Sequence, residues 1–221
     1  MNKHISYHEV LEGLQHANGC PLCKLEAESV RRYLDSVLYE SVNDPGVRSD
    51  LIRSRGYCVR HARRLAAMGN AFGIAGLYQD QIALISEFLD RLPDNPPRSS
   101  LLSREWQKTQ CCPACLVEAK SRERYVWTLV NGLADEEMRN AYASSSALCM
   151  PHFLCVLEKT KAAETYRFVV ARQREVIERL CHRLREFCRK HDYRFSHEGF
   201  GEESDSWLQA IRMVVGEGDG L

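Results

Sequence analysis

The chain has 221 residues, of which 44% are hydrophobic and 27% are charged, as expected for a globular protein with a buried core. Thirty Lys and Arg residues balance thirty Asp and Glu residues, so no net charge draws the molecule toward nucleic acid or acidic lipid. No apolar run approaches the roughly 20 residues of a membrane-spanning helix, and residues 1–15 lack the apolar stretch of a signal peptide. We therefore expect a cytoplasmic protein without membrane insertion, whose ten cysteines serve metal binding or redox chemistry instead of disulfides.

The first chemical motif is Cys20-Pro21-x-Cys23, which opens a segment with the apolar spacing of a helix. We expect this helix over residues 23–42. Its apolar stripe consists of Leu25, Val30, Leu34, Val37 and Leu38.

The next helix start is predicted at Asp44, a residue suited to the N-cap, with Pro45 at the first helical position. A second motif, Cys58-x-x-His61, follows at a further expected helix start. An amphipathic helix over residues 74–92 then ends at a proline. No segment shows the alternation of a strand, so the sequence predicts an all-α protein.

The second half of the chain repeats this order of motifs. The matched residues are Cys20 with Cys112, Cys23 with Cys115, Cys58 with Cys149, and His61 with His152. We expect a tandem duplication of a small helical bundle, with repeat 1 over residues 1–92 and repeat 2 over residues 104–195. A proline-rich linker over 93–103 would join them, and an acidic tail over 196–221 would carry a short docked helix.

In each repeat the matched motifs supply three cysteines and one histidine, a ligand set that saturates the tetrahedral coordination of a structural zinc ion. We expect each repeat to be clipped by its own Cys3His site. The expected ligands are Cys20, Cys23, Cys58 and His61 at one site, and Cys112, Cys115, Cys149 and His152 at the other. Two helix N-termini would face each ion and favour thiolate over thiol, and Arg55 and Arg60 would add positive charge beside the first site.

Two other uses of these ligands remain open: an iron–sulfur cluster and a metal-free thiol redox pair at Cys-Pro-x-Cys, although no βαβ pattern surrounds that motif. Two zinc ions per chain are favoured because four protein ligands complete the shell. Glu26 and Glu118 recur one turn after the Cys-Pro-x-Cys pairs. We interpret them as carboxylates that hydrogen-bond a ligand histidine or an arginine.

Two further pairs recur in the two halves, Asp44 with Arg48 and Asp135 with Arg139, at helical i, i+4 spacing. They predict a helix cap followed by a local ion pair.

The other four cysteines lie outside the repeated pattern. Cys111 adjoins a ligand as a neighbouring thiol, and Cys155 is expected in the core. Cys181, Cys188 and His191 lie near one face of a helix. A third metal site there would lack a Cys-x-x-Cys partner, so we interpret the two thiols as buried on the apolar stripe.

Basic residues gather in two stretches, which we interpret as solvated helix faces. They are Arg53, Arg55, Arg60, Arg63 and Arg64, and then Arg183, Arg185, Arg189, Lys190 and Arg194. Nucleic-acid binding stays an alternative because phosphate contacts need such clusters. In the tail, one helical face holds Trp207, Ile211, Val214 and Val215, which we expect to dock on the bundle, with a partner-binding segment as the alternative.

The segments "CPLCKLEAESVRRYLDSVLYESVNDPGVR", "SRGYCVRHA" and "KHDYRF" resemble an uncharacterised prokaryotic family, catalogued as a domain of unknown function. The resemblance covers most of the chain, and repeat 2 departs from it with "ADEEMR" in place of "NDPGVR". It implies metal-type ligands at the same eight positions and no activity that could be carried over. No Ser-His-Asp order, Walker loop or Gly-x-Gly-x-x-Gly motif indicates an enzyme. We therefore expect a zinc-stabilised interaction or regulatory module with a protein partner.

Overall fold

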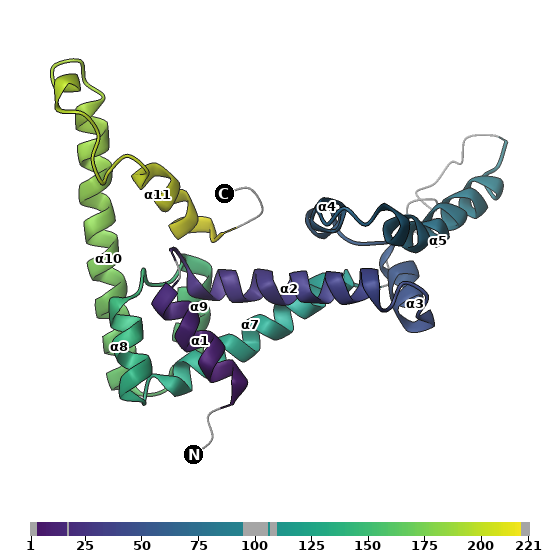
Figure 1. Cartoon of the computed structure of the whole chain (residues 1–221), viewed down its shortest axis with the longest axis horizontal. Coiled ribbons are helices and arrows are strands. Elements are labelled where there is room, and N and C mark those ends of the chain that lie inside the picture. The colour runs from purple at the N-terminus through teal and green to yellow at the C-terminus, as the bar shows by residue number, and fades with distance from the viewer. Residues whose placement is uncertain (1–3, 17, 95–105, 107–109, 218–221) are drawn as a thin grey trace. The chain divides into compact units, whose positions relative to one another are not determined.

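The structure, a computed structural model, describes residues 4–16, 18–94, 106 and 110–217. Its regular elements over these residues are all helical, which confirms the predicted fold class (Figure 1). The α-helices are α1 (Ile5–His16), α2 (Pro21–Tyr39), α3 (Pro45–Ser54), α4 (Val59–Ala67), α5 (Ala71–Asp90), α7 (Pro113–Gly132), α8 (Glu136–Ser144), α9 (Met150–Lys159), α10 (Ala163–Lys190) and α11 (Ser206–Val215). A short 3-10 helix, η1, spans Ser196–Glu198.

The chain divides into two compact units that do not coincide with the two sequence repeats. Unit 1 comprises Met1–Ala27 and Ser121–Leu221, and unit 2 comprises Glu28–Lys120. The boundaries fall inside the two long helices α2 and α7, so each unit contains part of both. The duplication itself stays a prediction, and residues 95–103 of the expected linker lie outside the described residues.

The core of unit 1 is built from α1, the start of α2, the end of α7, and helices α8 to α10. Helix α1 packs against α8, and α11 packs against both α9 and α10. Fully buried side chains at the centre include Val10, Leu22, Tyr125, Leu129, Met138, Tyr142 and Val169. Buried residues recur at helical spacing in α1 (Val10 and Leu14), α7 (Tyr125 and Leu129) and α8 (Met138 and Tyr142), so each of these helices presents one apolar face to this core.

The core of unit 2 uses the apolar stripe that the sequence predicts on α2. Val30, Leu34, Val37 and Leu38 are all buried there, whereas Leu25 is partly buried against the core of unit 1. Helix α5 packs against α3 and α4 and contributes Leu77, which is 1% exposed.

Both predicted helix caps are confirmed. The Asp44 carboxylate accepts a hydrogen bond from the Val47 N–H (2.9 Å) at the start of α3. Asp135 accepts one from the Glu137 N–H (3.0 Å) at the start of α8. Each satisfies a backbone donor that has no partner inside its helix.

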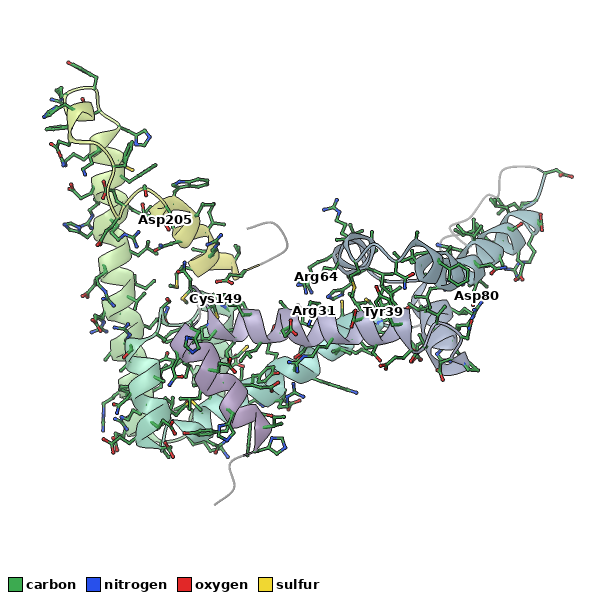
Figure 2. The ribbon with its side chains drawn as sticks, viewed as in Figure 1. Arg31, Tyr39, Arg64, Asp80, Cys149 and Asp205 are labelled. Carbon is green, nitrogen blue, oxygen red and sulfur yellow. The ribbon has the colours of Figure 1, made fainter. Side chains whose placement is uncertain are left out.

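The predicted local ion pairs after these caps are wrong. The guanidinium of Arg48 binds Asp80 of α5 at 2.6 Å, and that of Arg139 binds Glu164 of α10 at 2.9 Å (Asp80 is labelled in Figure 2). A cap carboxylate already accepts backbone N–H bonds, so each arginine reaches the helix packed alongside instead.

The face of α11 that was expected to dock is exposed. Its apolar residues Trp207, Ile211, Val214 and Val215 are 46%, 39%, 64% and 60% exposed. The side that approaches α9 and α10 instead carries buried Ser206 and half-buried Gln209, Arg212 and Met213. The long helix α10 is rich in arginine, and its partly buried polar groups need polar partners. The polar side of α11 therefore faces α10, and its apolar side faces outward.

The extra cysteines also depart from expectation. Cys181 and Cys188 are exposed and not buried, while Cys155 packs partly buried against the core of unit 1 and Cys111 is exposed. Across the described residues, Cys181, Cys188 and His191 do not assemble as a third group of metal ligands. None of the described helices is long and apolar enough to cross a membrane.

Candidate metal centres

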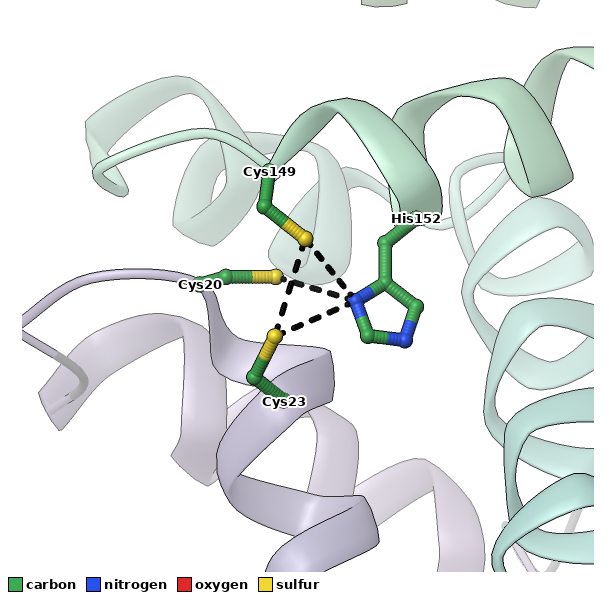
Figure 3. A group of neighbouring side chains, drawn as sticks. All are labelled: Cys20, Cys23, Cys149 and His152. Atoms are coloured by element: carbon green, nitrogen blue, oxygen red, sulfur yellow. Dashed lines mark hydrogen bonds between the residues drawn. The ribbon is translucent and has the colours of Figure 1, made fainter. Parts of the chain in front are cut away.

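The first cluster lies in unit 1, where the starts of α2 and α9 meet (Figure 3). Cys20 directly precedes α2 and Cys23 lies in its first turn, while Cys149 is the N-cap of α9 and His152 lies in its first turn. The Nδ1 atom of His152 is 3.4 Å from the Cys20 sulfur, 3.4 Å from the Cys23 sulfur and 3.1 Å from the Cys149 sulfur. The sulfurs of Cys23 and Cys149 are 3.6 Å apart.

The second cluster lies in unit 2 and repeats this construction at the starts of α4 and α7. Cys58 is the N-cap of α4, with His61 one turn in, and Cys112 and Cys115 flank the first turn of α7. The Nδ1 atom of His61 is 3.3 to 3.5 Å from the three sulfurs, and the sulfurs of Cys58 and Cys115 are 3.7 Å apart.

The structure thus brings all eight expected residues into two groups of four, but it corrects the grouping. Each Cys-Pro-x-Cys pair meets the Cys-x-x-His pair of the other sequence repeat, not that of its own. Helix length supplies the physical reason. The 19 residues of α2 carry the chain about 28 Å away from Cys20 and Cys23. The 10 residues of α3 span only about 15 Å and do not return Cys58 to that end.

The distances suit one tetrahedral ion per cluster. Zinc–sulfur and zinc–nitrogen bonds of about 2.3 and 2.0–2.1 Å place neighbouring ligand atoms about 3.6–3.8 Å apart at the corners of a tetrahedron. The ligand atoms in each cluster all lie within 4.8 Å of one another. Sulfur separations of 3.6 and 3.7 Å are far longer than the roughly 2.05 Å of a disulfide, and the cysteines are free thiols.

The starts of the helices set the electrostatics of the second cluster. Burial disfavours a charged Cys58 thiolate, but the backbone amides of His61 and Arg60 and the Cys115 thiol outweigh it and lower the pKa of Cys58. Burial and the neighbouring Cys58 sulfur raise the pKa of Cys115 to about 12. Of the two expected arginines, Arg60 interacts with the Cys58 and Cys115 sulfurs, whereas the Arg55 guanidinium stacks 4.5 Å from the centre of the Trp106 ring.

Glu26 holds the outer nitrogen of the first cluster's histidine. Its carboxylate accepts a hydrogen bond from Nε2 of His152 at 2.6 Å and from the Arg122 guanidinium at 3.0 and 2.9 Å. Burial opposes ionisation of Glu26, yet His152 and Arg122 outweigh it and lower its pKa. Burial likewise opposes protonation of His152, but three sulfurs and Glu26 raise its pKa. The carboxylate fixes the tautomer that turns Nδ1 toward the thiols, as predicted for this position.

The matching carboxylate of unit 2, Glu118, forms an ion pair with Arg60, the residue directly before His61 in the first turn of α4. The prediction that Glu118 binds an arginine is therefore confirmed. Three tyrosines, Tyr33, Tyr57 and Tyr78, lie near Cys112, and burial raises the pKa of each. The three phenols stay neutral, and their aromatic rings provide an apolar surrounding on the Cys112 side of the second cluster.

The end of the described chain covers the first cluster, which sequence analysis missed. The Glu217 N–H donates to the Cys23 sulfur at 3.3 Å, and its carboxylate accepts a hydrogen bond from the Cys20 N–H at 2.9 Å. Gly216 has φ +86°, and a Cβ atom there would lie 3.4 Å from the Cys23 sulfur and 3.5 Å from the Cys149 sulfur. The only sequence signal was a glycine directly after an apolar helix.

The two clusters differ in access to solvent. Cys20, Cys23, Cys149 and His152 are all buried, at 8% exposure or less. In the second cluster His61 and Cys112 are buried, whereas Cys58 and Cys115 are partly exposed. The second cluster therefore includes two partly exposed cysteines, whereas all four residues of the first cluster are buried.

The model of a family described as "Family of unknown function (DUF6062)" matches residues 1–219 of this chain. An uncharacterized 23.9 kDa protein in the xynA 3' region of Caldicellulosiruptor sp. (strain Rt8B.4) is 27% identical over 201 residues. That match covers 89% of this chain and 95% of the relative. No solved structure matches.

Proposed function

This chain belongs to the DUF6062 family of unknown function, and we propose that it is a zinc-stabilised helical interaction or regulatory module of the cytoplasm. Each Cys3His cluster would hold one structural zinc ion, through Cys20, Cys23, Cys149 and His152 in unit 1, and Cys58, His61, Cys112 and Cys115 in unit 2.

The observation that carries the proposal is the convergence of four protein ligands on one point in each cluster. Four protein ligands complete the shell of a structural zinc ion, whereas catalytic zinc keeps a position open for water or substrate. The ligand spacing also favours one ion over an iron–sulfur cluster, because a cluster inserts several iron and sulfide atoms between its thiolates.

Structural zinc fits a chain divided into two small units. Each cluster joins the starts of two helices that are far apart in the sequence. Cys23 and Cys149 of the first cluster are 126 positions apart, and His61 and Cys112 of the second are 51 positions apart. Metal binding of this kind contributes on the order of 10 kcal/mol of folding free energy in small zinc-binding peptides. Zinc would therefore stabilise the helix junctions and leave the outer surfaces available for contacts.

Exposed apolar side chains support a protein partner. On α5, Phe72, Ile82 and Leu89 are 90%, 62% and 55% exposed, and α11 exposes Trp207 and Val214. Apolar residues gathered on helix surfaces are typical of protein contacts. Nucleic acid is less favoured, because several basic side chains of the second stretch bind carboxylates. These pairs are Arg189 with Glu186 and Glu198, Lys190 with Glu203, and Arg194 with Asp192.

Elemental analysis of protein purified without added metal tests this function. We expect two zinc ions per chain, a colourless solution, and loss of helical circular dichroism when a strong chelator removes both ions. A brown preparation whose visible absorption bleaches on reduction would replace zinc with an iron–sulfur cluster. Full helicity in metal-free protein would contradict the structural role.

A further inference from the structure

Unit 1 contains a cavity of about 430 Å3 beside the first cluster. Its walls come from α10, α11 and the loop between α8 and α9, and Cys20 and Cys149 form part of its lining. The volume falls within the roughly 300–1,000 Å3 of small-molecule sites. The metal ligands turn toward one another, so the cavity offers a separate surface to a ligand.

Four arginines line this cavity, and Glu202 is the one carboxylate in its lining. Outside the lining, Glu175 pairs with Arg172 and Arg179, and Asp205 pairs with Arg183. Arg172, Arg179 and Arg183 come from one face of α10, and Arg212 comes from α11 (Figure 1 shows both helices). Guanidinium groups from two helices that share a cavity repel one another, so an anion between them is favoured.

Nearby carboxylates use only part of these guanidinium groups. Arg172 donates one amino group to Glu175 (2.8 Å) and the other to the Ser145 carbonyl (2.5 Å). Arg183 donates to Gln209 at 2.7 Å and to Asp205 at 2.8 Å (Asp205 is labelled in Figure 2). Each guanidinium has five N–H donors, so both retain donors for a ligand.

Three of those remaining donors are buried. Within the described part of the chain, the Nε atoms of Arg172, Arg183 and Arg212 are buried and have no hydrogen-bond partner. A buried donor without an acceptor has lost its hydrogen bonds to water without compensation, which is unfavourable. Three such donors among the lining residues of one cavity indicate a ligand rich in acceptor oxygens.

The loop that forms the floor of the cavity is strained. Ala147 has φ +62°, a left-handed conformation that non-glycine residues rarely adopt. The Ser145 hydroxyl supports it by accepting the Ala147 N–H at 3.2 Å. Because Cys149 follows two residues later, the strained turn fixes the cavity floor to the first cluster.

We propose that this cavity binds a small molecule through a phosphate group held by Arg172, Arg179, Arg183 and Arg212. Phosphate is favoured over a single carboxylate because its oxygens point in tetrahedral directions and can accept from guanidiniums on both helices, whereas a carboxylate presents one plane. This inference goes beyond the structural role of the zinc ions and assigns the protein a ligand.

Inorganic phosphate serves as the probe. NMR signals of the arginine Nε–H groups should shift saturably as phosphate is added to zinc-loaded protein, and sodium chloride of matched ionic strength should not shift them. The double variant Arg179→Gln/Arg212→Gln should raise the dissociation constant for phosphate at least tenfold. Arg174→Gln is the matched control, since Arg174 lies exposed on α10 outside the cavity lining.

Three results would overturn the proposal: no saturable shift in the unaltered protein, equal weakening by Arg174→Gln, or tighter binding of acetate than of phosphate. Zinc is counted in every sample. A variant that keeps two zinc ions yet loses phosphate binding reports on the cavity alone. If the unaltered protein holds two zinc ions but does not bind phosphate, the cavity proposal fails and the proposed metal function stands.

Discussion

Glu26 connects the His152 imidazole of the first cluster to the Arg122 guanidinium of α7. It is 4% exposed and lies between the His152 imidazole and the Arg122 guanidinium, so its own charge is balanced on both sides. Without a carboxylate there, the outer nitrogen of His152 would be buried beside an arginine. A buried imidazole that has lost its acceptor orients its other nitrogen less firmly toward a metal.

Glu26→Gln removes this charge while keeping the size of the side chain. We expect about a 10- to 100-fold loss of zinc affinity at one of the two sites, measured by competition with a chromophoric chelator. Glu28→Gln is the control, because Glu28 is two residues away and pairs with Arg31 and Arg32 near the surface. Unchanged affinity in Glu26→Gln would show that the histidine needs no carboxylate.

At the scale of elements, the segment after α11 acts as a cover over the starts of α2 and α9. Gly216 has φ +86° and ψ 174°, a backbone region that only glycine adopts readily. That conformation turns the Glu217 N–H onto the Cys23 sulfur. An N–H donor to a thiolate stabilises its charge, so the cover contributes electrostatics as well as shielding.

Gly216→Ala should speed the loss of zinc from the first cluster to a chelator, because the added methyl group strains the backbone by about 1–3 kcal/mol and contacts two ligand sulfurs. Gly199→Ala is the matched control. Gly199 has a similar conformation, φ +68° and ψ 164°, but a Cβ there meets nothing within 4 Å. Equal release of zinc in both variants would show that backbone strain anywhere in unit 1 suffices and that the cover has no local effect.

At the scale of the whole molecule, the crossed ligand sets tie each sequence repeat to the other. The chain enters unit 2 through α2 and leaves it through α7, and each of these helices begins at one cluster. The first cluster closes a loop from Cys23 to Cys149, which contains all of unit 2. A metal ion in either cluster would therefore restrain one segment from each expected repeat.

Two triple variants separate crossed from local grouping by counting zinc. Cys20→Ala/Cys23→Ala/Cys149→Ala removes three ligands of the first cluster and should keep one chelator-resistant zinc ion. Cys20→Ala/Cys23→Ala/Cys58→Ala leaves two ligands in the first cluster and three in the second, and should keep none. Grouping within each sequence repeat would interchange the two results.

The sequence by itself determined the all-helical fold, the caps at Asp44 and Asp135, and the eight side chains that form the clusters. These features depend on local spacing and residue type, which the sequence displays directly. It also indicated that Glu26 would hydrogen-bond a ligand histidine or an arginine, because the carboxylate recurs one turn after each Cys-Pro-x-Cys motif.

Only the tertiary structure decided which motifs meet in one cluster. Two Cys-Pro-x-Cys pairs and two Cys-x-x-His pairs allow two groupings, and the choice depends on where α2 and α3 carry the chain. Tertiary packing likewise decided the partners of Arg48 and Arg139, the exposed face of α11, the cover at Gly216 and the arginine cavity. Each of these brings together residues distant in sequence, and no local pattern records such a meeting.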